Sequence, residues 1–188
     1  MEVDELVAAT KELIREKAVT KFETPIELAS GQLSNFFVDG KAGFSKAADL
    51  RIACEAMHGL ATQAGISYDA VGGLTLGADH LCVGIAMVAD KDWFIVRKEA
   101  KKRGTARRIE GARLGPGSRV YIVEDVVSTG GSLFAAVDAV VETGATVVAA
   151  CTLLDRGDLA GEYLEQRGIP YFSISSFRDF GMPPVSPV

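Results

Sequence analysis

The chain has 188 residues, 48% of them hydrophobic, and a formal net charge of −5. This length suits one domain with a substantial core, and the negative charge argues against a nucleic-acid partner. No run approaches the roughly 18 uncharged apolar residues that a membrane span requires, and the acidic N-terminus does not resemble a signal peptide. The three cysteines stand far apart in apolar surroundings, so we expect buried thiols in a cytoplasmic protein.

The first 43 residues predict a helix followed by a small hood of strands. Apolar residues at helical spacing predict an amphipathic helix over 4–17, with Asp4 as its N-cap. Proline and glycine then separate short β-rich pieces, which predict strands near 26–29 and 35–39.

The remaining segment, 44–188, alternates between strand and helix patterns. In chain order these predict a helix over 46–64 capped by Ser45, a strand over 69–73, a helix over 79–89, strands over 93–97 and 119–124, a helix over 131–143, a strand over 145–154, a short helix over 158–167 and a strand over 170–175. Repeated β-α-β units predict an α/β fold, a doubly wound and mainly parallel sheet with helices on both faces. We expect one domain over 1–188, with 1–43 as N-terminal helix and hood.

A long charged segment, 99–117, interrupts this alternation. It has no apolar periodicity and contains four glycines, and a loop of this length in a compact domain is usually a lid or disordered. Seven of the twenty lysines and arginines lie between 97 and 108. Such a concentration in an acidic chain indicates a local anionic partner, although a solvated charged loop would have the same composition.

The run from Val120 to Ser132 has the clearest chemistry in the sequence. An apolar, β-branched strand leads to Glu124 and Asp125, and then to a turn of small hydroxyl and glycine residues over 128–132. The first N–H groups of the following helix lack internal partners, so this turn can hold a phosphate. Carboxylates repel a phosphate unless they bind another group, so the acidic pair suggests a ribose whose hydroxyls face it. The absence of a Gly-Lys-Ser/Thr sequence excludes a Walker loop.

This run resembles the signature of type I phosphoribosyltransferases, which bind 5-phosphoribosyl 1-diphosphate (PRPP). In that family a second turn, which matches Thr75 to Ala78 here, holds the diphosphate of PRPP; taken alone, its glycines are explained equally well by tight packing. The resemblance implies PRPP contacts from both turns, the acidic pair and the start of the charged segment: Thr75, Leu76, Gly77, Arg97, Lys98, Lys101, Glu124, Asp125, Val126, Val127, Ser128, Thr129, Gly130, Gly131 and Ser132.

The start of the charged segment, Arg97-Lys98-Glu99-Ala100-Lys101-Lys102-Arg103-Gly104, resembles the catalytic loop of orotate phosphoribosyltransferases. Arg97, Lys98 and Lys101 match that family, whereas Arg103 stands where the family usually has histidine. Because arginine stays protonated, we do not expect Arg103 to donate a proton, but it can neutralise pyrophosphate. The resemblance implies catalytic roles for Lys98, Lys101, Arg103 and Asp125.

An arginine after the strand over 145–154 is implied to hold the base. The same family uses the arginine of an Asp-Arg pair, here Asp155-Arg156, to grip the carboxylate of orotate, and a planar guanidinium suits a carboxylate bidentately. The hood resembles the region that covers the substrate, although Ala29 stands where many members have lysine. The implied orotate contacts are Phe36, Phe37, Lys41, Ser128 and Arg156.

The resemblance covers nearly the whole chain in order. It implies a homodimeric enzyme of pyrimidine synthesis that converts orotate and PRPP to orotidine 5′-monophosphate and pyrophosphate, with a catalytic loop that reaches the neighbouring subunit. It also implies Mg²⁺, held mainly by substrate oxygens and water, with Asp125 as the candidate protein ligand.

Two alternatives stay open. The same fold can act on another base, such as a purine, and Ala29 and Arg103 leave room for this. The second alternative is a regulatory protein that binds PRPP without catalysis, although the lysines of the loop argue against it. We expect no chemistry from His58 or His80, which fall within predicted helices.

Overall fold

The computed structural model describes residues 1–27, 31, 33–99, 108–157 and 159–185. Its helices are α1 (Val3–Leu13), the π-helical turn η1 (Ile14–Ala18), α2 (Gly40–Gly43), α3 (Ala47–Gln63), α4 (Asp79–Ala89), α5 (Gly131–Val141), α6 (Leu159–Glu165) and the 3-10 turn η2 (Phe177–Phe180). Its strands are β1 (Val19–Glu27), β2 (Leu33–Val38), β3 (Ala70–Leu74), β4 (Asp92–Val96), β5 (Ile109–Gly111), β6 (Arg119–Val127), β7 (Thr146–Asp155) and β8 (Tyr171–Ser176). Within the described residues, no helix is long and apolar enough to cross a membrane.

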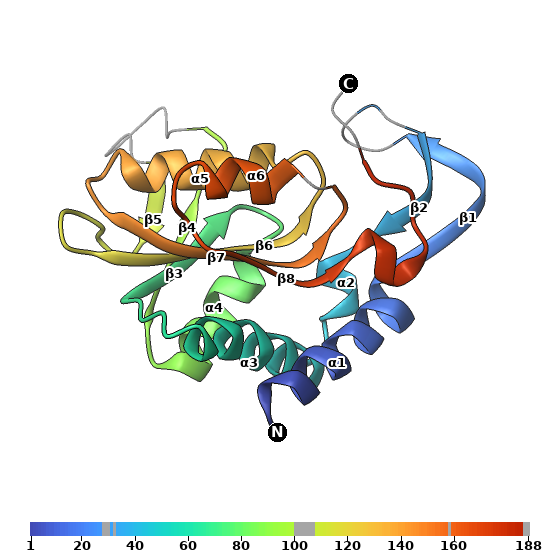
Figure 1. Ribbon diagram of the computed structural model, residues 1–188, viewed down its shortest axis with the longest axis horizontal. Coiled ribbons are helices and arrows are strands. Elements are labelled where there is room, and N and C mark those ends of the chain that lie inside the picture. Colours follow the sequence, from blue (N-terminus) through green and yellow to red (C-terminus); the bar gives the residue numbers. More distant parts are fainter. Residues whose placement is uncertain (28–30, 32, 100–107, 158, 186–188) are drawn as a thin grey trace.

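A six-stranded sheet forms the centre of the molecule, in the order β5-β4-β3-β6-β7-β8 (Figure 1). β3 runs parallel to β4 and β6, and β7 runs parallel to β6 and β8. β5 is antiparallel to β4 at one edge. The middle strands are continuous apolar runs because both of their faces are covered, and Val120 to Val123 in β6 are fully buried. The predicted doubly wound, mainly parallel sheet is therefore confirmed.

Helices cover both faces of this sheet, as the sequence predicts (Figure 1). Successive side chains of β6 point to opposite faces. Tyr121 packs with Met57 and Leu81 in a core on the side of α1, α3 and α4. Ile122 packs with Leu133 in a second core, on the side of α5 and α6. The strand that carries the acidic pair is thus held between two apolar layers.

All three cysteines are free and buried, as expected. Burial raises the pKa of the Cys54 and Cys151 thiols to about 12, so both stay protonated near neutral pH. Since the thiolate is the reactive form, these side chains serve as small apolar residues of the core.

The N-terminal hood is a two-stranded antiparallel sheet, separate from the central one. β1 pairs with β2 from Val19↔Val38 to Glu27↔Leu33. The prediction of a first strand near 26–29 was wrong about its start, because β1 begins at Val19. Most side chains of β1 are exposed, so its sequence contains no apolar run that would predict a strand. It is a strand because it pairs with β2.

The start and end of the first helix also differ from the prediction. α1 begins at Val3 with Glu2 as its N-cap, so the prediction of Asp4 as N-cap was wrong. Glu2 and Glu5 form a reciprocal capping box, which satisfies two N–H groups that would otherwise lack partners. At the other end, α1 gives way after Leu13 to the π-helical turn η1, which continues to the start of β1.

The second predicted cap was wrong as well. Ser45 does not begin α3, whose N-cap is Lys46. The capping side chain of this region is Asp39, which accepts hydrogen bonds from the N–H groups of Lys41 and Ala42 and so begins the short helix α2. This cap fixes the junction between the hood and the α/β core.

β6 runs beyond its predicted end at 124, as far as Val127. It does so because β7 keeps pairing with it up to Val127↔Asp155. On its other side, β3 leaves β6 after Gly72↔Ile122, so the last residues of β6 have a strand neighbour on one side only. The acidic pair therefore lies within β6, not after it, on the side that β3 has left.

Part of the predicted long loop is a strand. Residues 109–111 form β5, which pairs with the edge of β4 in the register Phe94↔Gly111 to Val96↔Ile109. The N–H of Arg97 also donates to Arg108 O at 2.8 Å. This pairing satisfies main-chain groups at the open edge of the sheet, so it needs no apolar periodicity. The rest of the loop's first half, 100–107, lies outside the described residues.

Candidate active site

A cleft of about 370 Å³ lies beyond the C-terminal ends of the parallel strands, where open α/β sheets bind ligands. Its walls come from β2, β6, the turn into α5 and the residue after β7; the lining residues are Phe37, Val38, Glu124, Val126, Val127, Ser128, Thr129, Gly130, Gly131, Ser132, Leu133 and Arg156. Residues from the hood, from the centre and from near the end of the chain thus meet around one space.

The turn over 128–132 leads from β6 into the N-terminus of α5. Gly130 has a φ of +86°, a conformation that L side chains rarely adopt. A Cβ on Gly130 would also lie 2.2 Å from the ring of Phe134, one turn along α5. Gly131 and Ser132 begin the helix and line the cleft, so the helix N-terminus faces it. This geometry suits an anion such as a phosphate.

Glu124 and Asp125, the acid pair, are buried beside the cleft, with 4% and 9% of their surface exposed. The N–H of Asp125 donates to Glu124 Oε1 at 3.2 Å, and the N–H of Val126 donates to Asp125 Oδ1 at 2.8 Å. Burial, and then the neighbouring Asp125, raise the pKa of Glu124 well above its usual value. The acid pair offers several acceptor oxygens in one place, as a sugar with two adjacent hydroxyls requires.

The turn over 75–78 packs against the acid pair through Gly77. A Cβ on Gly77 would lie 2.5 Å from Asp125 Oδ1, so a larger residue would displace that carboxylate. The glycine of the preceding strand has a different cause, since a Cβ on Gly73 would lie 2.1 Å from Val123 O. Packing within the sheet therefore explains Gly73, whereas Gly77 brings the main chain of the turn to the acid pair.

Thr75 fixes the start of this turn with two hydrogen bonds. Its N–H donates to Val96 O at 2.9 Å, and its hydroxyl donates to Asp79 Oδ2 at 2.8 Å. The Thr75–Leu76 peptide bond is cis. Because Val96 ends β4, the turn lies next to the point at which the charged segment begins.

The hood reaches the acid pair through Lys41. Its Nζ lies 3.2 Å from Asp39 Oδ1 and 3.9 Å from Asp125 Oδ2. Gly40 permits this approach, because a Cβ on it would lie 2.9 Å from Asp125 Cβ. Burial by itself would raise the pKa of Asp39, but hydrogen bonds from α2 and the Lys41 ammonium outweigh it and lower that pKa. The structure thus places Lys41, a predicted orotate contact, beside Asp125.

Arg156 is buried in the wall of the cleft and only 3% exposed. Its Nη1 donates to Phe36 O at 3.4 Å and its Nη2 to Ser34 Oγ at 3.3 Å, while Nε has no partner among the described residues. Burial lowers the pKa of the guanidinium. A buried guanidinium that lines the cleft and makes only long hydrogen bonds suits a ligand with two negatively charged oxygens.

The two hood aromatics have different surroundings. Phe37 lines the cleft and is partly exposed. Phe36 contributes its carbonyl oxygen to Arg156, and the Lys21 ammonium lies 5.7 Å from the centre of its ring. Of the two predicted contacts, Phe37 is the one whose side chain borders the cleft.

Arg97 and Lys98 lie just after β4, away from the walls of the cleft. Arg97 Nε donates to Glu99 O at 3.4 Å, and its Nη1 lies 3.9 Å from Glu110 Oε1. The Lys98 side chain is exposed. Lys101 and Arg103, the predicted catalytic residues of the loop, lie outside the described residues. So does Ala29, which stands where many members of the family have lysine.

Three residues beside this site were not among the predicted contacts. Ser34 accepts from Arg156, and only the fold of the hairpin brings it there. Asp39 caps α2, and an aspartate two residues before Lys41 is a cap signal that the sequence does contain. Both ring nitrogens of His80 are buried without a partner among the described residues, and burial lowers its pKa although Asp125 raises it.

A doubly wound sheet whose acid pair adjoins a glycine-containing turn at a helix N-terminus is the arrangement expected of a phosphoribosyltransferase. Comparison with known proteins agrees. The model of the phosphoribosyl transferase domain matches residues 65–173. The chain therefore belongs to the phosphoribosyltransferase family.

Several proteins that are similar to this chain over almost its whole length are named orotate phosphoribosyltransferase, which is one enzyme within this family. Orotate phosphoribosyltransferase of Corynebacterium glutamicum (strain R) is 40% identical over 177 residues, which are 93% of this chain and 94% of that protein. The crystal structure of Mycobacterium tuberculosis H37Rv orotate phosphoribosyltransferase in complex with Fe(III) dicitrate is 35% identical, with a TM-score of 0.80 over 94% of this chain and 99% of that chain. The same enzyme in complex with PRPP has a TM-score of 0.76 at 33% identity, with the same coverage.

Proposed function

We propose that this protein is an orotate phosphoribosyltransferase, which converts orotate and PRPP to orotidine 5′-monophosphate and pyrophosphate for pyrimidine synthesis. The observation that carries orotate as the base is the buried guanidinium of Arg156, whose Nε lacks a partner among the described residues. Orotate has a ring carboxylate that would pair with it. A purine has none and would leave a buried charge unpaired, which is costly. The names of the similar proteins support the same base.

PRPP occupies the other wall of the cleft in this proposal. Its 5′-phosphate binds the turn over 128–132 at the N-terminus of α5. Its ribose hydroxyls donate to Glu124 and Asp125, and its diphosphate lies at the turn over 75–78, whose Gly77 touches the acid pair. Because these contacts and those of Arg156 come from all parts of the sequence, we propose that the whole chain, 1–188, works as one domain.

The reaction is a substitution at the anomeric carbon of the ribose. The bond from this carbon to the diphosphate oxygen breaks, and a bond to the ring nitrogen of orotate forms, through a transition state with oxocarbenium character. Orotate arrives as an anion, so the base needs little activation. The protein therefore has two tasks: to orient the two reactants, and to stabilise the charge on departing pyrophosphate. The proposal gives the second task to Lys98, Lys101 and Arg103, with the loop excluding water when it closes.

Mg²⁺ is the proposed cofactor. Among the described residues, no group of three or more histidine, cysteine or acidic side chains could hold a metal ion. Mg²⁺ prefers oxygen ligands and keeps several waters, so substrate oxygens and water can supply most of its ligands. Asp125 is the protein ligand that fits, with substrate oxygens and water as the others. When bound, Mg²⁺ supplies positive charge to the diphosphate.

A panel of bases tests this function. Purified protein with PRPP and Mg²⁺ is offered orotate, uracil, adenine, guanine and hypoxanthine in separate reactions, and pyrophosphate release is measured. We expect release with orotate alone. Release with a purine and not with orotate would establish the other-base alternative. PRPP binding without release in any reaction would establish a regulator instead.

We further propose that the protein is a homodimer. Val83 and Met87 lie one turn apart on α4, opposite its buried face, and Met87 is 78% exposed. Trp93 in β4 is in register with Val71, whose side chain lies in the core on the side of α4, so Trp93 faces the same side. A contiguous patch of exposed apolar residues marks a contact surface, and we propose that these three side chains form one. A second copy on this side would lie next to β4, from which the charged loop leaves.

Mixed dimers test whether that loop acts on the neighbouring subunit. Lys101→Ala, with a defective loop, and Asp125→Asn, with a defective ribose site, are unfolded and refolded together. Two-fold symmetry then gives each mixed dimer one site with an intact pocket and an intact loop. Random pairing makes about half of the dimers mixed, so we expect about a quarter of wild-type activity. Activity no better than the mean of the two parents, with mixed dimers confirmed by mass spectrometry, would contradict the shared site.

A further inference from the structure

The main chain of Arg156 is held from two sides. Its N–H donates to Val127 O, at the end of β6, at 2.7 Å. Its carbonyl oxygen accepts a hydrogen bond from the N–H of Val185, also at 2.7 Å. Arg156 therefore lies between β6, which leads into the turn over 128–132 (the proposed phosphate turn), and a segment close to the C-terminus.

That segment, Gly181–Val185, follows η2 and is called the C-terminal strap here. Met182 and Val185 are buried, and the N–H of Met182 donates to Phe177 O at 3.0 Å. The strap passes so close to the residue after Arg156 that a Cβ on Gly157 would lie 2.8 Å from Val185 O. The contact of the strap with this part of the site is therefore a close main-chain approach.

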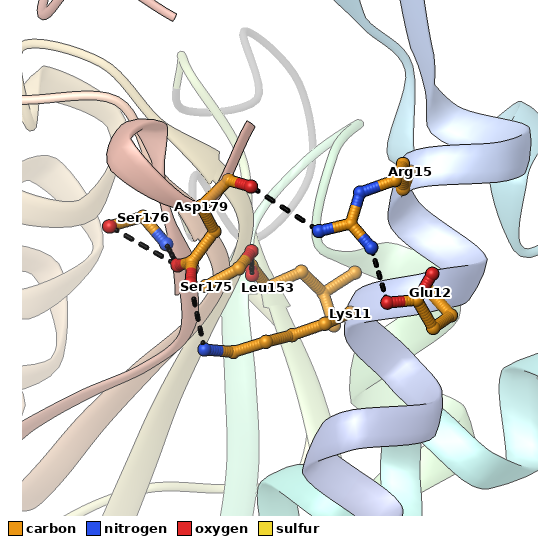
Figure 2. A network of polar contacts seen from close by, with 7 residues as sticks. All are labelled: Lys11, Glu12, Arg15, Leu153, Ser175, Ser176 and Asp179. Carbon is orange, nitrogen blue, oxygen red and sulfur yellow. Dashed lines mark hydrogen bonds and ion pairs between the residues drawn. The ribbon is translucent and has the colours of Figure 1, made fainter. Parts of the chain in front are cut away.

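η2, from which the strap leaves, is tied to α1 and η1 by the polar network shown in Figure 2. Lys11 Nζ lies 3.1 Å from Asp179 Oδ1, and Arg15 Nη2 donates to Asp179 O at 3.3 Å. The guanidinium of Arg15 also lies 5.4 Å from the centre of the Phe180 ring. Asp179 in turn accepts from the N–H of Ser176 at 2.7 Å. Each exposed contact is weak by itself, but together they fix where the strap begins.

The side chain of Arg156 has no comparably strong support. Its bonds to Phe36 O and Ser34 Oγ are 3.4 and 3.3 Å long, near the limit for hydrogen bonds. Its position in the wall of the cleft thus depends mainly on where the main chain holds it. A carboxylate that binds a planar guanidinium through two parallel bonds tolerates little displacement.

We propose that the C-terminal strap is a positioning element for the base: the Val185 N–H, anchored through η2 to α1, sets the main chain of Arg156 so that its guanidinium meets the carboxylate of orotate. This inference rests on the proposed function, because it assigns that carboxylate to Arg156. It adds residues 181–185 to the determinants of base binding, although no strap side chain lines the cleft.

Two substitutions at one position separate the hydrogen bond from the packing. Val185→Pro removes the N–H, since proline has none, and Val185→Ala keeps the N–H and removes most of the buried side chain. We expect Val185→Pro to raise the KM for orotate about 2- to 10-fold, the range for one hydrogen bond, and to leave the KM for PRPP unchanged. Val185→Ala should change neither KM, although it lowers the melting temperature.

Val185→Pro and Val185→Ala are also made in a protein that carries Arg156→Ala. This comparison tests whether the strap acts on the base through the Arg156 side chain. If the strap acts through Arg156, Val185→Pro has no further effect on the KM for orotate once the guanidinium is gone. An equal rise in both backgrounds, or an equal rise in the KM for both substrates, would overturn the inference. If Arg156→Ala by itself leaves the KM for orotate unchanged, the proposed role of Arg156 fails. If Arg156→Ala raises it and Val185→Pro does not, the strap inference alone fails.

Should Val185→Pro not fold, the double variant Lys11→Met, Arg15→Met takes its place. It releases the strap from α1 while keeping the apolar stems of both side chains. We expect the KM for orotate alone to rise about 2-fold, less than for loss of the direct bond. Lys17→Met is the matched control, because it breaks the comparable ion pair to Asp49 at 2.6 Å, which does not touch the strap. Equal values for the double variant and this control would overturn the inference.

Discussion

Replacement of Arg156 by alanine is expected to raise the KM for orotate by roughly 10- to 100-fold, which corresponds to the loss of one charge-assisted hydrogen bond or more. The KM for PRPP should change little, because the phosphate turn and the acid pair stay in place. Initial rates with each substrate varied in turn measure both constants. Arg113→Ala, at an exposed arginine that does not line the cleft, is the control.

The same side chain makes a prediction about stability. Arg156 is buried without an ion pair among the described residues, and burial of an unpaired charge is unfavourable. Arg156→Met should therefore keep the melting temperature or raise it, while it abolishes selection of orotate. A structural arginine would behave in the opposite way, with a lower melting temperature and an equal rise in the KM for both substrates.

Asp125→Asn is expected to weaken PRPP binding by roughly 10- to 100-fold, since a ribose hydroxyl then donates to a neutral amide instead of a carboxylate. The substitution keeps the size of the side chain, so Gly40 and Gly77 should still pack against it. Calorimetric titration with PRPP and Mg²⁺ measures the change.

The matched control for this variant is Asp138→Asn, at an exposed carboxylate on α5 that does not line the cleft. Its PRPP affinity should equal that of the wild type. An unchanged affinity in Asp125→Asn would remove the ribose from the acid pair, and with it the proposed orientation of PRPP.

The phosphate turn and the acid pair were predictable because they are contiguous. Thirteen residues, Val120 to Ser132, contain a strand, two carboxylates, a glycine turn and a helix start, and each of these has a local sequence signal. Of these residues, Glu124 and Val126 to Ser132 line the cleft, and Asp125 is buried beside it. By contrast, the role of Gly77 stayed ambiguous, because only the fold shows which side chain a Cβ at that position would meet.

The surroundings of Arg156 could not be predicted from the sequence. The resemblance to a family implied its role, but its burial depends on Ser34 and Phe36, more than a hundred residues earlier. The spacing of apolar residues predicts helices and strands, but it does not predict contacts between residues so far apart in the sequence. The placement of Lys41 beside Asp125 has the same origin, because the hood and the core meet only in the folded chain.

The wrong element boundaries share a physical cause. Hydrophobic patterns report burial, whereas β1, β5 and the end of β6 are strands because a neighbouring strand pairs with them. The two predicted caps, Asp4 and Ser45, are residue types that often cap helices, but the helices begin elsewhere. Glu2 caps α1 and forms a capping box with Glu5 that satisfies two N–H groups. Lys46 is the N-cap of α3, and the side chain of Asp39 caps α2, a separate short helix that the pattern did not predict.

We expect the contacts of Arg156 with the hood to form late in folding. The turn over 128–132 joins β6 to α5, which are adjacent in the sequence. The hydrogen bonds from Arg156 to Phe36 and Ser34 instead close loops of 120 and 122 residues. Loop closure costs entropy that grows with the logarithm of loop length, and contacts between distant residues form slowly. We therefore expect a folding chain to form the turn over 128–132 before it forms the surroundings of Arg156.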